Sequence, residues 1–275
     1  MDEQKQRTIA DFGEQWVRYT TNDGYYGSLE LFRDICGPLL DIEALQGARV
    51  CDIGSGTGRI VAMLIGAGAE HVIAIEPSDA FTVLQDNTRQ WAGRIELIRE
   101  TGEKIPANRQ IDFVFSIGVL HHIEDPMPVV RAAYDALRPG GKMLVWLYGR
   151  EGNEAYLRMV ELVRKFSVHL PASALSGVSH LLNVGLTLYI PLCRVLPLPL
   201  SGYMNNVIGR FSRSKRHLVI YDQLNPAVAH YYRREEAEGL LVDAGFKNVR
   251  LHHRHGYSWT VVGEKPDPVA FSPGP

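Results

Sequence analysis

The chain has 275 residues, of which 45% are hydrophobic and 22% charged, and its formal net charge at pH 7 is -2. This composition excludes collagen-like, low-complexity and broadly disordered proteins, and the charge gives no overall attraction to nucleic-acid phosphates. The cysteines, Cys36, Cys51 and Cys193, are widely spaced and odd in number, which argues against a disulfide framework or a zinc site. The N-terminus is polar and acidic, unlike a signal peptide, so we expect a cytoplasmic protein.

The predicted elements change character near residue 46. Residues 1–45 carry aromatic side chains among polar ones and lack strand-like runs, which predicts a helical cap. Strands are expected at 48–54, 71–77, 94–100, 111–118 and 142–149, and helices at 59–69, 78–93 and 127–141, the last ended by Pro139, Gly140 and Gly141. Apolar strands that alternate with helices indicate a parallel sheet covered on both faces.

The second half contains a long insert and a terminal hairpin. The segment between Gly149 and Gln223 departs from the strand-helix rhythm and is too long for a loop, which predicts a helical subdomain. A helix is expected over 234–246, followed by strands at 248–255 and 257–265. These boundaries predict a cap at 1–45, a core at 46–149 and 223–265, a helical lid or substrate insert at 150–222, and a flexible tail at 266–275.

A glycine-rich segment carries the strongest functional signal. It reads VCDIGSGTGR over 50–59 and joins an expected strand to an expected helix. Its glycine spacing differs from that of dinucleotide-binding proteins, and it lacks the Gly-Lys-Ser/Thr of a phosphate-binding P-loop. Asp52 would repel a pyrophosphate but would suit a ligand with an ammonium group. Glu76 ends the next strand, where an acid commonly binds the hydroxyl groups of a ribose.

Four segments resemble the class I S-adenosylmethionine-dependent methyltransferases of type 11 and type 25. VCDIGSGTGR resembles their first motif, VIAIEPS the acidic second-strand motif, IDFVFSIGVLHHIEDP the fourth-strand motif, and LRPGGKMLVW the turn into the fifth strand. The resemblance covers about residues 48–147 and extends to about 265. It implies an α/β fold with a doubly wound, Rossmann-like seven-stranded sheet, a terminal antiparallel β-hairpin, an N-terminal helical cap and a helical lid insert.

The resemblance also implies a cofactor, S-adenosyl-L-methionine, with S-adenosyl-L-homocysteine as product. Asp52 and the backbone of Gly54, Gly56 and Gly58 would hold its methionine part, and Glu76 the ribose. Ser116 and Ile117 would lie near the sulfonium. Many relatives bind adenine through an Asp after the third strand; here Thr101 stands at that position and Glu103 follows, so either could bind adenine. The other residues carried over to the cofactor site are Ser55, Pro77, Gly102 and His121.

Methyl transfer to oxygen requires a group that takes the acceptor's proton. The candidate catalytic residues are His121 and His122, which follow the fourth strand, and Tyr148, which ends the fifth. Packing or helix entry is the alternative role for the paired histidines. Tyr221 and Asp222, at the exit of the insert, are further options for the acceptor pocket.

The terminal hairpin carries three more histidines. Period-two alternation predicts Val249, Leu251, His253 and His255 on one face and Arg250, His252 and Arg254 on the other. His253 and His255 could bind a metal, and His255 could meet the substrate. No third Cys, Asp or Glu ligand is evident nearby, so structural histidines are favoured and no metal is expected.

The insert is both basic and apolar. From Leu162 to Tyr221 it has no Asp or Glu, and its basic residues are Arg164, Lys165, Arg194, Arg210, Arg213, Lys215 and Arg216. Its apolar stretch over 180–200 is interrupted by prolines, which favours a pocket-lining or interfacial element over a membrane span. We therefore expect a lid, with contact between 162–221 and an anionic membrane surface as an option. Stacking aromatics are scarce among the charges of 205–217, so no nucleic acid is expected as a partner.

Together these features predict a cytoplasmic methyltransferase, with peripheral membrane contact as an option. The expected reaction is O-methylation of a small-molecule or lipid-like acceptor. One alternative is methylation of carbon or nitrogen on a soluble metabolite or sugar. The other is a non-catalytic, cofactor-binding protein associated with a membrane.

Overall fold

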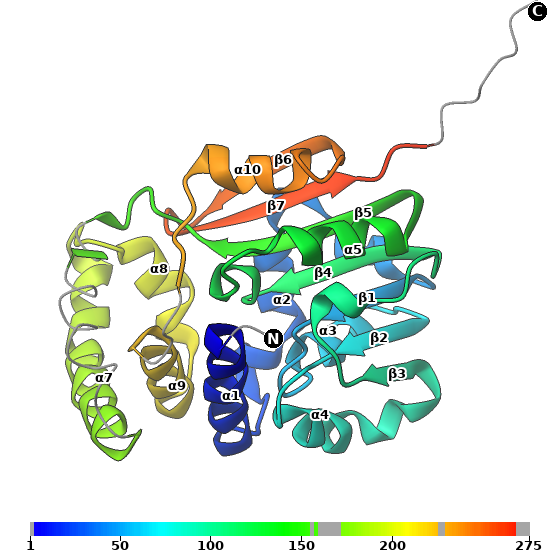
Figure 1. Cartoon of the computed structure of the whole chain (residues 1–275). Coiled ribbons are helices and arrows are strands. Elements are labelled where there is room, and N and C mark those ends of the chain that lie inside the picture. The colour runs from blue at the N-terminus through cyan, green and yellow to red at the C-terminus, as the bar shows by residue number, and fades with distance from the viewer. Residues whose placement is uncertain (1–2, 155–156, 159–171, 225–228, 268–275) are drawn as a thin grey trace, which may run out of the picture.

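The computed structural model describes residues 3–154, 157–158, 172–224 and 229–267. Seven strands form one sheet in the order β3-β2-β1-β4-β5-β7-β6 (Figure 1). They are β1 (Arg49–Ile53), β2 (His71–Ile75), β3 (Ile95–Ile98), β4 (Ile111–Ile117), β5 (Leu137–Tyr148), β6 (Lys247–Arg254) and β7 (Ser258–Glu264). The first five run parallel, and β7 runs antiparallel to both of its neighbours. The doubly wound fold with a terminal hairpin is confirmed.

Alternate residues of the strands enter two separate cores. The helices are α1 (Glu3–Arg18), α2 (Leu29–Cys36), α3 (Arg59–Gly66), α4 (Ala80–Thr88), α5 (Met127–Ala136), α7 (Ala172–Val195), α8 (Ser201–Asn206), α9 (Arg213–Leu224) and α10 (Arg234–Val242). Val50 and Phe115 pack on one face with side chains of α2 and α3. Cys51 and Val114 pack on the other with side chains of α5 and α10. The sheet is therefore buried on both sides, as its continuous apolar strands predicted.

The fifth strand begins earlier than the sequence predicted. The helix α5 ends at Ala136, and the Pro-Gly-Gly segment expected to close it already belongs to β5. Gly140 N–H donates to the Lys265 carbonyl, and Lys265 N–H donates to the Gly141 carbonyl, both at 2.8 Å. Pairing with the last strand outweighs the local turn preference of these residues because it satisfies their backbone groups.

The expected alternation of the hairpin histidines fails at its tip. His255 lies beyond the end of β6 with φ +49°, so it is part of the turn and does not continue the face of His253. Arg254 and His255 both contact Asp34 of α2, although a strand would point them to opposite faces. A residue in the left-handed region redirects the chain, and the period-two rule no longer applies there.

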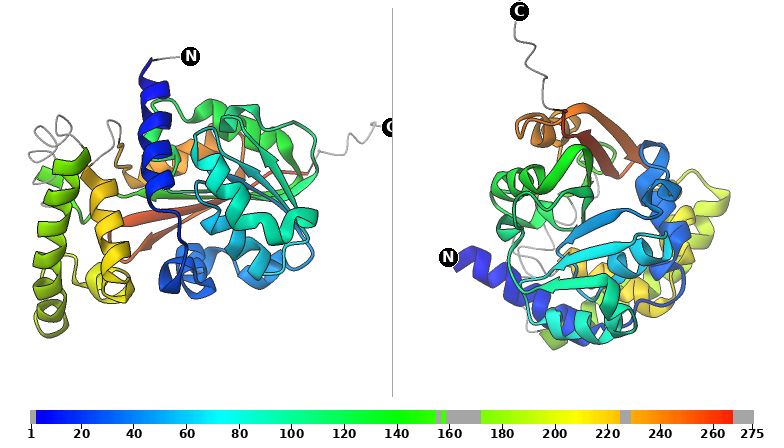
Figure 2. Two further views of the ribbon diagram at one scale, coloured as in Figure 1. Left: turned by 90° about the horizontal axis from the view of Figure 1, so that it is seen from below. Right: turned by 90° about the vertical axis from the view of Figure 1, so that its right-hand side faces the viewer.

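The described part of the insert forms helices at the carboxyl ends of the parallel strands. Figure 1 shows α7 and α9 standing beside the sheet, and the left view in Figure 2 shows α1 running between them and the core. Helix α7 continues through Pro191, which the sequence treated as an interruption. Ser176–Val195 is long and apolar enough to cross a membrane by length and composition, and 22% of that window is buried. Such a helix also suits a lid, so its composition alone does not assign it to a membrane.

Acids from the cap oppose some of the insert's positive charges. Arg210 pairs with Glu30 at 2.5 Å. The buried ammonium of Lys215 donates to the carbonyl and hydroxyl of Thr21 and lies 3.4 Å from Asp23. These two basic residues of the insert therefore have acidic partners that lie far away in the sequence. Arg164 and Lys165 lie outside the described residues, as does most of the predicted tail, and the division into domains stays a prediction.

Candidate active site

A cavity of about 1140 Å³ lies at the carboxyl ends of the central strands. The strand order reverses between β1 and β4, and open α/β sheets bind ligands at such a point. One end of the cavity is lined by α1, the glycine loop after β1 and the end of β2; the other is lined by the ends of β4 and β5 and by α7, α8 and α9. Ligand pockets usually measure roughly 300–1000 Å³, so this one can hold a cofactor and an acceptor together.

The glycine loop turns so tightly that side chains are excluded. Gly54, Gly56 and Gly58 have φ of +76°, +50° and +83°, a region that disfavours other residues. A Cβ on Gly54 would lie 2.4 Å from the Val119 side chain. The N–H groups of Gly54 and Ser55 both donate to the Ile75 carbonyl, at 2.9 and 3.0 Å. These contacts fix the loop against the end of β2 and leave its backbone facing the cavity.

Glu76 is held rigidly beside this loop. One carboxylate oxygen accepts from the Gly56 N–H at 2.7 Å. The other accepts from the Ser78 N–H at 2.9 Å and from the Ser78 hydroxyl at 2.5 Å. The side chain is buried yet lines the cavity. A carboxylate oriented in this way can accept further hydrogen bonds from a ligand through its remaining lone pairs.

Asp52 carries a buried acceptor that needs a partner. Its Oδ2 has no hydrogen-bond partner among the described residues. Burial raises the pKa of Asp52 to about 7, although the Ser55 hydroxyl and the charge of Arg59 both act to lower it. Buried polar atoms are nearly always hydrogen-bonded, so an unpaired one next to a cavity indicates that a ligand donor or water completes the site.

The structure brings most of the predicted site residues to the cavity. Those that line it are Gly54, Ser55, Gly56, Glu76, Pro77, Thr101, Gly102, Glu103, Ile117, His122 and Tyr148. Asp52, Gly58, Ser116 and His121 lie behind this lining. Glu103 forms an ion pair with Lys5 of α1, which the sequence did not anticipate. Tyr221 is buried outside the lining, and the side chain of Asp222 lies outside the described part of the structure.

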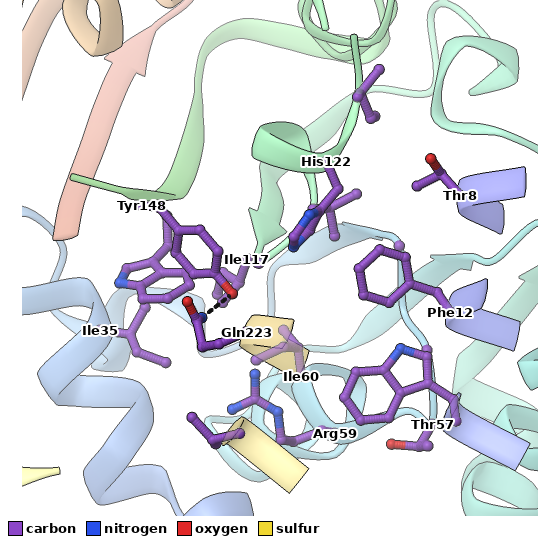
Figure 3. A pocket seen from close by; sticks show the side chains of 18 of the residues that line it. Thr8, Phe12, Ile35, Thr57, Arg59, Ile60, Ile117, His122, Tyr148 and Gln223 are labelled. Atoms are coloured by element: carbon purple, nitrogen blue, oxygen red, sulfur yellow. Dashed lines mark hydrogen bonds between the residues drawn. The ribbon is translucent and has the colours of Figure 1, made fainter. Parts of the chain in front are cut away.

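The three candidate bases occupy different positions. His122 faces the cavity opposite Phe12, with 4.7 Å between the two ring centroids (Figure 3). His121 is fully buried behind it and packs against Tyr148, with 3.8 Å between their ring centroids. Tyr148 also reaches the cavity, where its hydroxyl accepts a hydrogen bond from Gln223. Because His122 and Tyr148 line the cavity and His121 does not, His122 and Tyr148 are the better candidates for contact with a substrate.

The family comparison is consistent with this geometry. A methyltransferase-domain family matches residues 51–145, which include the glycine loop, Glu76 and His122. The chain therefore carries a methyltransferase domain of the S-adenosylmethionine-dependent kind. Its cofactor is S-adenosylmethionine.

Curated relatives match over about two fifths of the chain. The tRNA U34 carboxymethyltransferase of Pseudoalteromonas atlantica is 31% identical over 115 residues, which are 41% of this chain and 36% of that protein. The enzyme of the same name from Klebsiella pneumoniae is 34% identical over 113 residues, 40% of this chain and 34% of that protein. The methyltransferase thus aligns with just over a third of the length of these relatives, and the similarity does not reach their full architecture.

Solved structures share the fold over nearly the whole chain. One is human N-acetylserotonin methyltransferase in complex with S-adenosylmethionine. The alignment covers 97% of this chain and 60% of the human chain, with a TM-score of 0.56 and 13% identity. Another is magnesium protoporphyrin IX methyltransferase from Synechocystis with bound S-adenosylhomocysteine. The alignment covers 92% of this chain and 93% of the Synechocystis chain, with a TM-score of 0.53 and 15% identity. At this level of identity the likeness shows the fold alone.

The names of the curated relatives correct one prediction. The sequence led us to expect no nucleic-acid partner, but these relatives are named for action on tRNA. The expectation that nucleic acid is not a partner was wrong. It rested on the net charge and on the scarcity of aromatic residues in one short segment, and neither describes how a single nucleotide would enter a cavity. Recognition of nucleic acid can rest on local contacts that overall composition does not reveal.

Sequence reasoning also missed several residues of the cavity. Trp16 of α1 lies over Gly56, where a built Cβ would be 3.5 Å from the indole nitrogen. Gln223 and Tyr231 approach from the opposite side. The aromatic content of residues 1–45 was a signal for Trp16, but no motif distinguishes Gln223 or Tyr231. Their positions depend on how the insert returns to the core.

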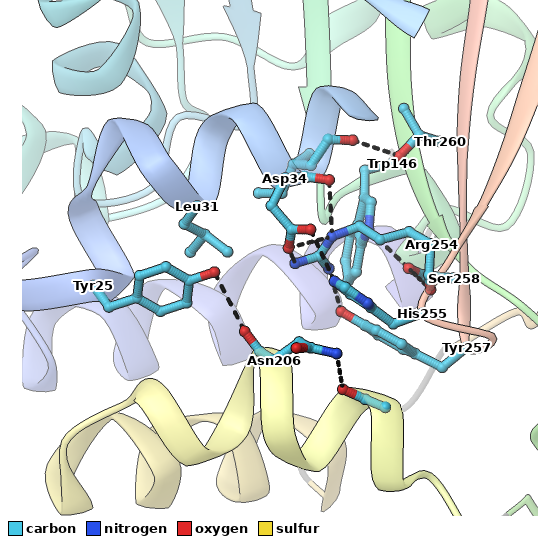
Figure 4. A network of polar contacts seen from close by, with 12 residues as sticks. Tyr25, Leu31, Asp34, Trp146, Asn206, Arg254, His255, Tyr257, Ser258 and Thr260 are labelled. Carbon is cyan, nitrogen blue, oxygen red and sulfur yellow. Dashed lines mark hydrogen bonds and ion pairs between the residues drawn. The ribbon is translucent and has the colours of Figure 1, made fainter. Parts of the chain in front are cut away.

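A buried polar network closes the hairpin side of the cavity (Figure 4). Arg254, 2% exposed, donates to the Asp34 carboxylate and to the Tyr257 hydroxyl. His255 lies 2.8 Å from the other Asp34 oxygen. Burial alone would raise the pKa of Asp34, but the His255 hydrogen bond and the Arg254 charge outweigh it and hold that pKa below its ordinary value. Arg254, His255 and Tyr257 each have a protein partner here, which supports a structural role for His255.

Proposed function

We propose that this methyltransferase transfers a methyl group to an oxygen atom of an acceptor held at the insert end of the cavity. The supporting observation is that one continuous cavity joins the glycine loop and its acids to a chamber of aromatic and aliphatic side chains. When bound, S-adenosylmethionine supplies a methyl group on a positively charged sulfur. The protein's main contribution is to hold the acceptor in line with that group and to exclude water, because positioning accounts for much of the rate of such displacements.

For the cofactor site, the proposal assigns roles by position. The backbone of Gly54, Ser55 and Gly56 would bind the methionine part, with Asp52 behind it and Gly58 fixing the start of α3. Glu76 would bind the ribose, and Glu103 or Thr101 the adenine. The residues that would complete the walls of the site are Pro77, Gly102, Ser116, Ile117 and His121.

For the acceptor, we propose that His122 removes the proton of a hydroxyl group. The imidazole faces the cavity and is held between Phe12 and Tyr148. Neighbouring Tyr148 would orient the acceptor. The chamber is built mainly from apolar side chains such as Leu186, Ile208 and Val219, which supports a small acceptor with substantial apolar surface.

A second candidate acceptor is a nucleoside within RNA. The tRNA-directed names of the curated relatives favour it. The family model covers the glycine loop and not the insert, and the match to these relatives covers 41% of the chain, so the similarity leaves the choice of acceptor open. The cytoplasmic location expected from the sequence agrees with either acceptor and stays a prediction.

A labelled-methyl assay tests the proposal. Purified protein and methyl-labelled S-adenosylmethionine are incubated in parallel with small-molecule extract and with total tRNA. Label in the organic or aqueous metabolite fraction supports a small acceptor, and label in tRNA supports the second candidate. No label in any arm, with the cofactor shown to bind by calorimetry, would contradict catalysis of both kinds.

Matched variants connect the label to the site. Asp52→Ala combined with Glu76→Ala should lower cofactor affinity by at least tenfold, because both carboxylates border the glycine loop. Asp243→Ala combined with Glu70→Ala removes two exposed carboxylates and serves as the control. Unchanged affinity in the first variant would overturn the cofactor assignment.

A further inference from the structure

Three polar side chains form a hydrogen-bonded chain across the acceptor end of the cavity. Gln223 Nε2 donates to the Tyr148 hydroxyl at 2.8 Å. The Tyr231 hydroxyl donates to Gln223 Oε1 at 3.0 Å. The residues come from the end of β5, the last turn of α9 and the segment before α10, and all line the cavity. The insert and the core are therefore joined at this point by directional contacts.

The aromatic rings beside this chain pack against one another. Tyr231 stacks on Tyr148, with 5.3 Å between ring centroids and 26° between planes. His121 packs against Tyr148 at 3.8 Å, and His122 meets its edge at 87°. Figure 3 shows Tyr148, Gln223 and His122 pointing into the same part of the cavity, opposite Phe12. Phe12, His122, Tyr148 and Tyr231 all line the cavity, so a flat unsaturated ring could pack against aromatic side chains here.

The surroundings make the polar chain selective. Ile35, Leu186 and Leu224 are among the apolar residues that line the cavity around it. A polar atom buried in such surroundings costs free energy unless it is hydrogen-bonded. An acceptor that brings a matching oxygen can exchange hydrogen bonds with the amide and the phenols, whereas an acceptor without one cannot.

We propose that Tyr148, Gln223 and Tyr231 recognise a flat unsaturated ring that carries a hydrogen-bonding oxygen atom. The inference rests on the proposed function, because it names the chemistry of the acceptor for that same cavity. A free phenol and a pyrimidine base share this chemistry. Gln223 and Tyr231 act as specificity residues in this account, and His122 lies close enough to the same rings to meet the reacting hydroxyl.

The test measures binding to the whole 275-residue chain saturated with S-adenosylhomocysteine. Calorimetry compares three probes: 1-naphthol, its saturated counterpart 1-decalol, and uridine. At least one flat probe should bind about tenfold or more tightly than 1-decalol. Binding of 1-naphthol identifies a free phenol as the source of the ring, and binding of uridine identifies a pyrimidine base. Equal binding of 1-decalol, or no binding of either flat probe, would overturn the inference.

Variants separate recognition from packing. Gln223→Leu should lower the affinity for the flat probe by about tenfold, which corresponds to the loss of one hydrogen bond in a buried site. Its affinity for S-adenosylhomocysteine should stay unchanged. Tyr231→Phe removes only a hydroxyl group and provides the same test if the leucine variant does not fold. Gln85→Leu, an exposed helical position on α4, is the matched control.

The two proposals fail in different ways. If the wild-type protein does not bind S-adenosylhomocysteine, the proposed function fails before the acceptor is tested. If the cofactor product binds and label is transferred, but Gln223→Leu and Tyr231→Phe bind the flat probe like the wild type, only the assignment of these residues is wrong.

Discussion

Asp52 should make cofactor binding depend on pH. Its pKa of about 7 lies above the ordinary value, so the cofactor-free protein keeps a proton there below pH 7. An ionised carboxylate favours the cofactor's ammonium group, and a protonated one does not. We expect affinity for S-adenosylmethionine to rise up to tenfold per pH unit below 7, level off, and fall above about pH 8 as an α-amino group loses its proton.

Calorimetry at several pH values measures this dependence. Below pH 7, binding should release a proton, so the heat should change with the ionisation enthalpy of the buffer. The Asp52→Asn variant should bind S-adenosylmethionine weakly, and its affinity should no longer rise with pH below pH 7. A profile in the Asn variant that matches the wild type would mean that another group titrates.

His122 should matter for chemistry more than for binding. Because its ring faces the cavity and that of His121 does not, His122→Ala should lower kcat by roughly 10²- to 10⁴-fold, the usual contribution of a general base. Its pH-rate profile should also flatten, while cofactor affinity stays within about threefold. His180→Ala, at an exposed position on α7, is the control. An unchanged pH-rate profile would remove His122 from this role.

At the scale of elements, α1 acts as a cover over the cofactor end of the cavity. Phe12 and Trp16 line the cavity from this helix, and Lys5 pairs with Glu103. The ion pair is partly exposed, and such pairs contribute little, about 0–1 kcal/mol. The aromatic contacts of Phe12 and Trp16 should therefore contribute more than this ion pair to holding α1 over the cavity.

Trp16→Ala should speed release of S-adenosylhomocysteine. Loss of the indole uncovers Gly56 and removes apolar contact area, so we expect the dissociation rate to rise by roughly tenfold. Lys5→Ala should change the rate by less than about threefold, and Val17→Ala, on the exposed side of α1, should leave it unchanged. Stopped-flow fluorescence measures all three; a larger effect from Lys5 than from Trp16 would reverse this ranking.

At the scale of the whole molecule, polar contacts join the cap to the insert. The Lys215 ammonium is buried under the cap and donates to both oxygens of Thr21. Burial lowers the pKa of Lys215, and the nearby Asp23 charge opposes that shift. The hydrogen bonds to Thr21 satisfy this buried cation, so the two segments depend on each other although they are far apart in the chain.

Lys215→Ala should destabilise the fold more than a neighbouring change on the same helix. The substitution removes the hydrogen bonds from the Lys215 ammonium to Thr21, and hydrogen bonds to charged groups contribute about 1.5–3 kcal/mol to the free energy of unfolding. Arg213→Ala removes an exposed charge and should cost less than about 0.5 kcal/mol. Urea denaturation gives both values. Equal values would mean that the Lys215 contact contributes nothing specific.

The sequence by itself determined the sheet, the class of fold and the glycine loop with Asp52 and Glu76, because each rests on short-range periodicity or spacing. It misplaced the start of β5 and the direction of His255, where pairing between distant strands and a left-handed turn residue outweigh local preferences. Only the tertiary structure decided that Gln223 and Tyr231 meet Tyr148, that Trp16 covers Gly56, and that Lys215 has partners in the cap. Those contacts join segments far apart in the chain, and their formation depends on how the insert and the cap pack on the core, which no local pattern encodes.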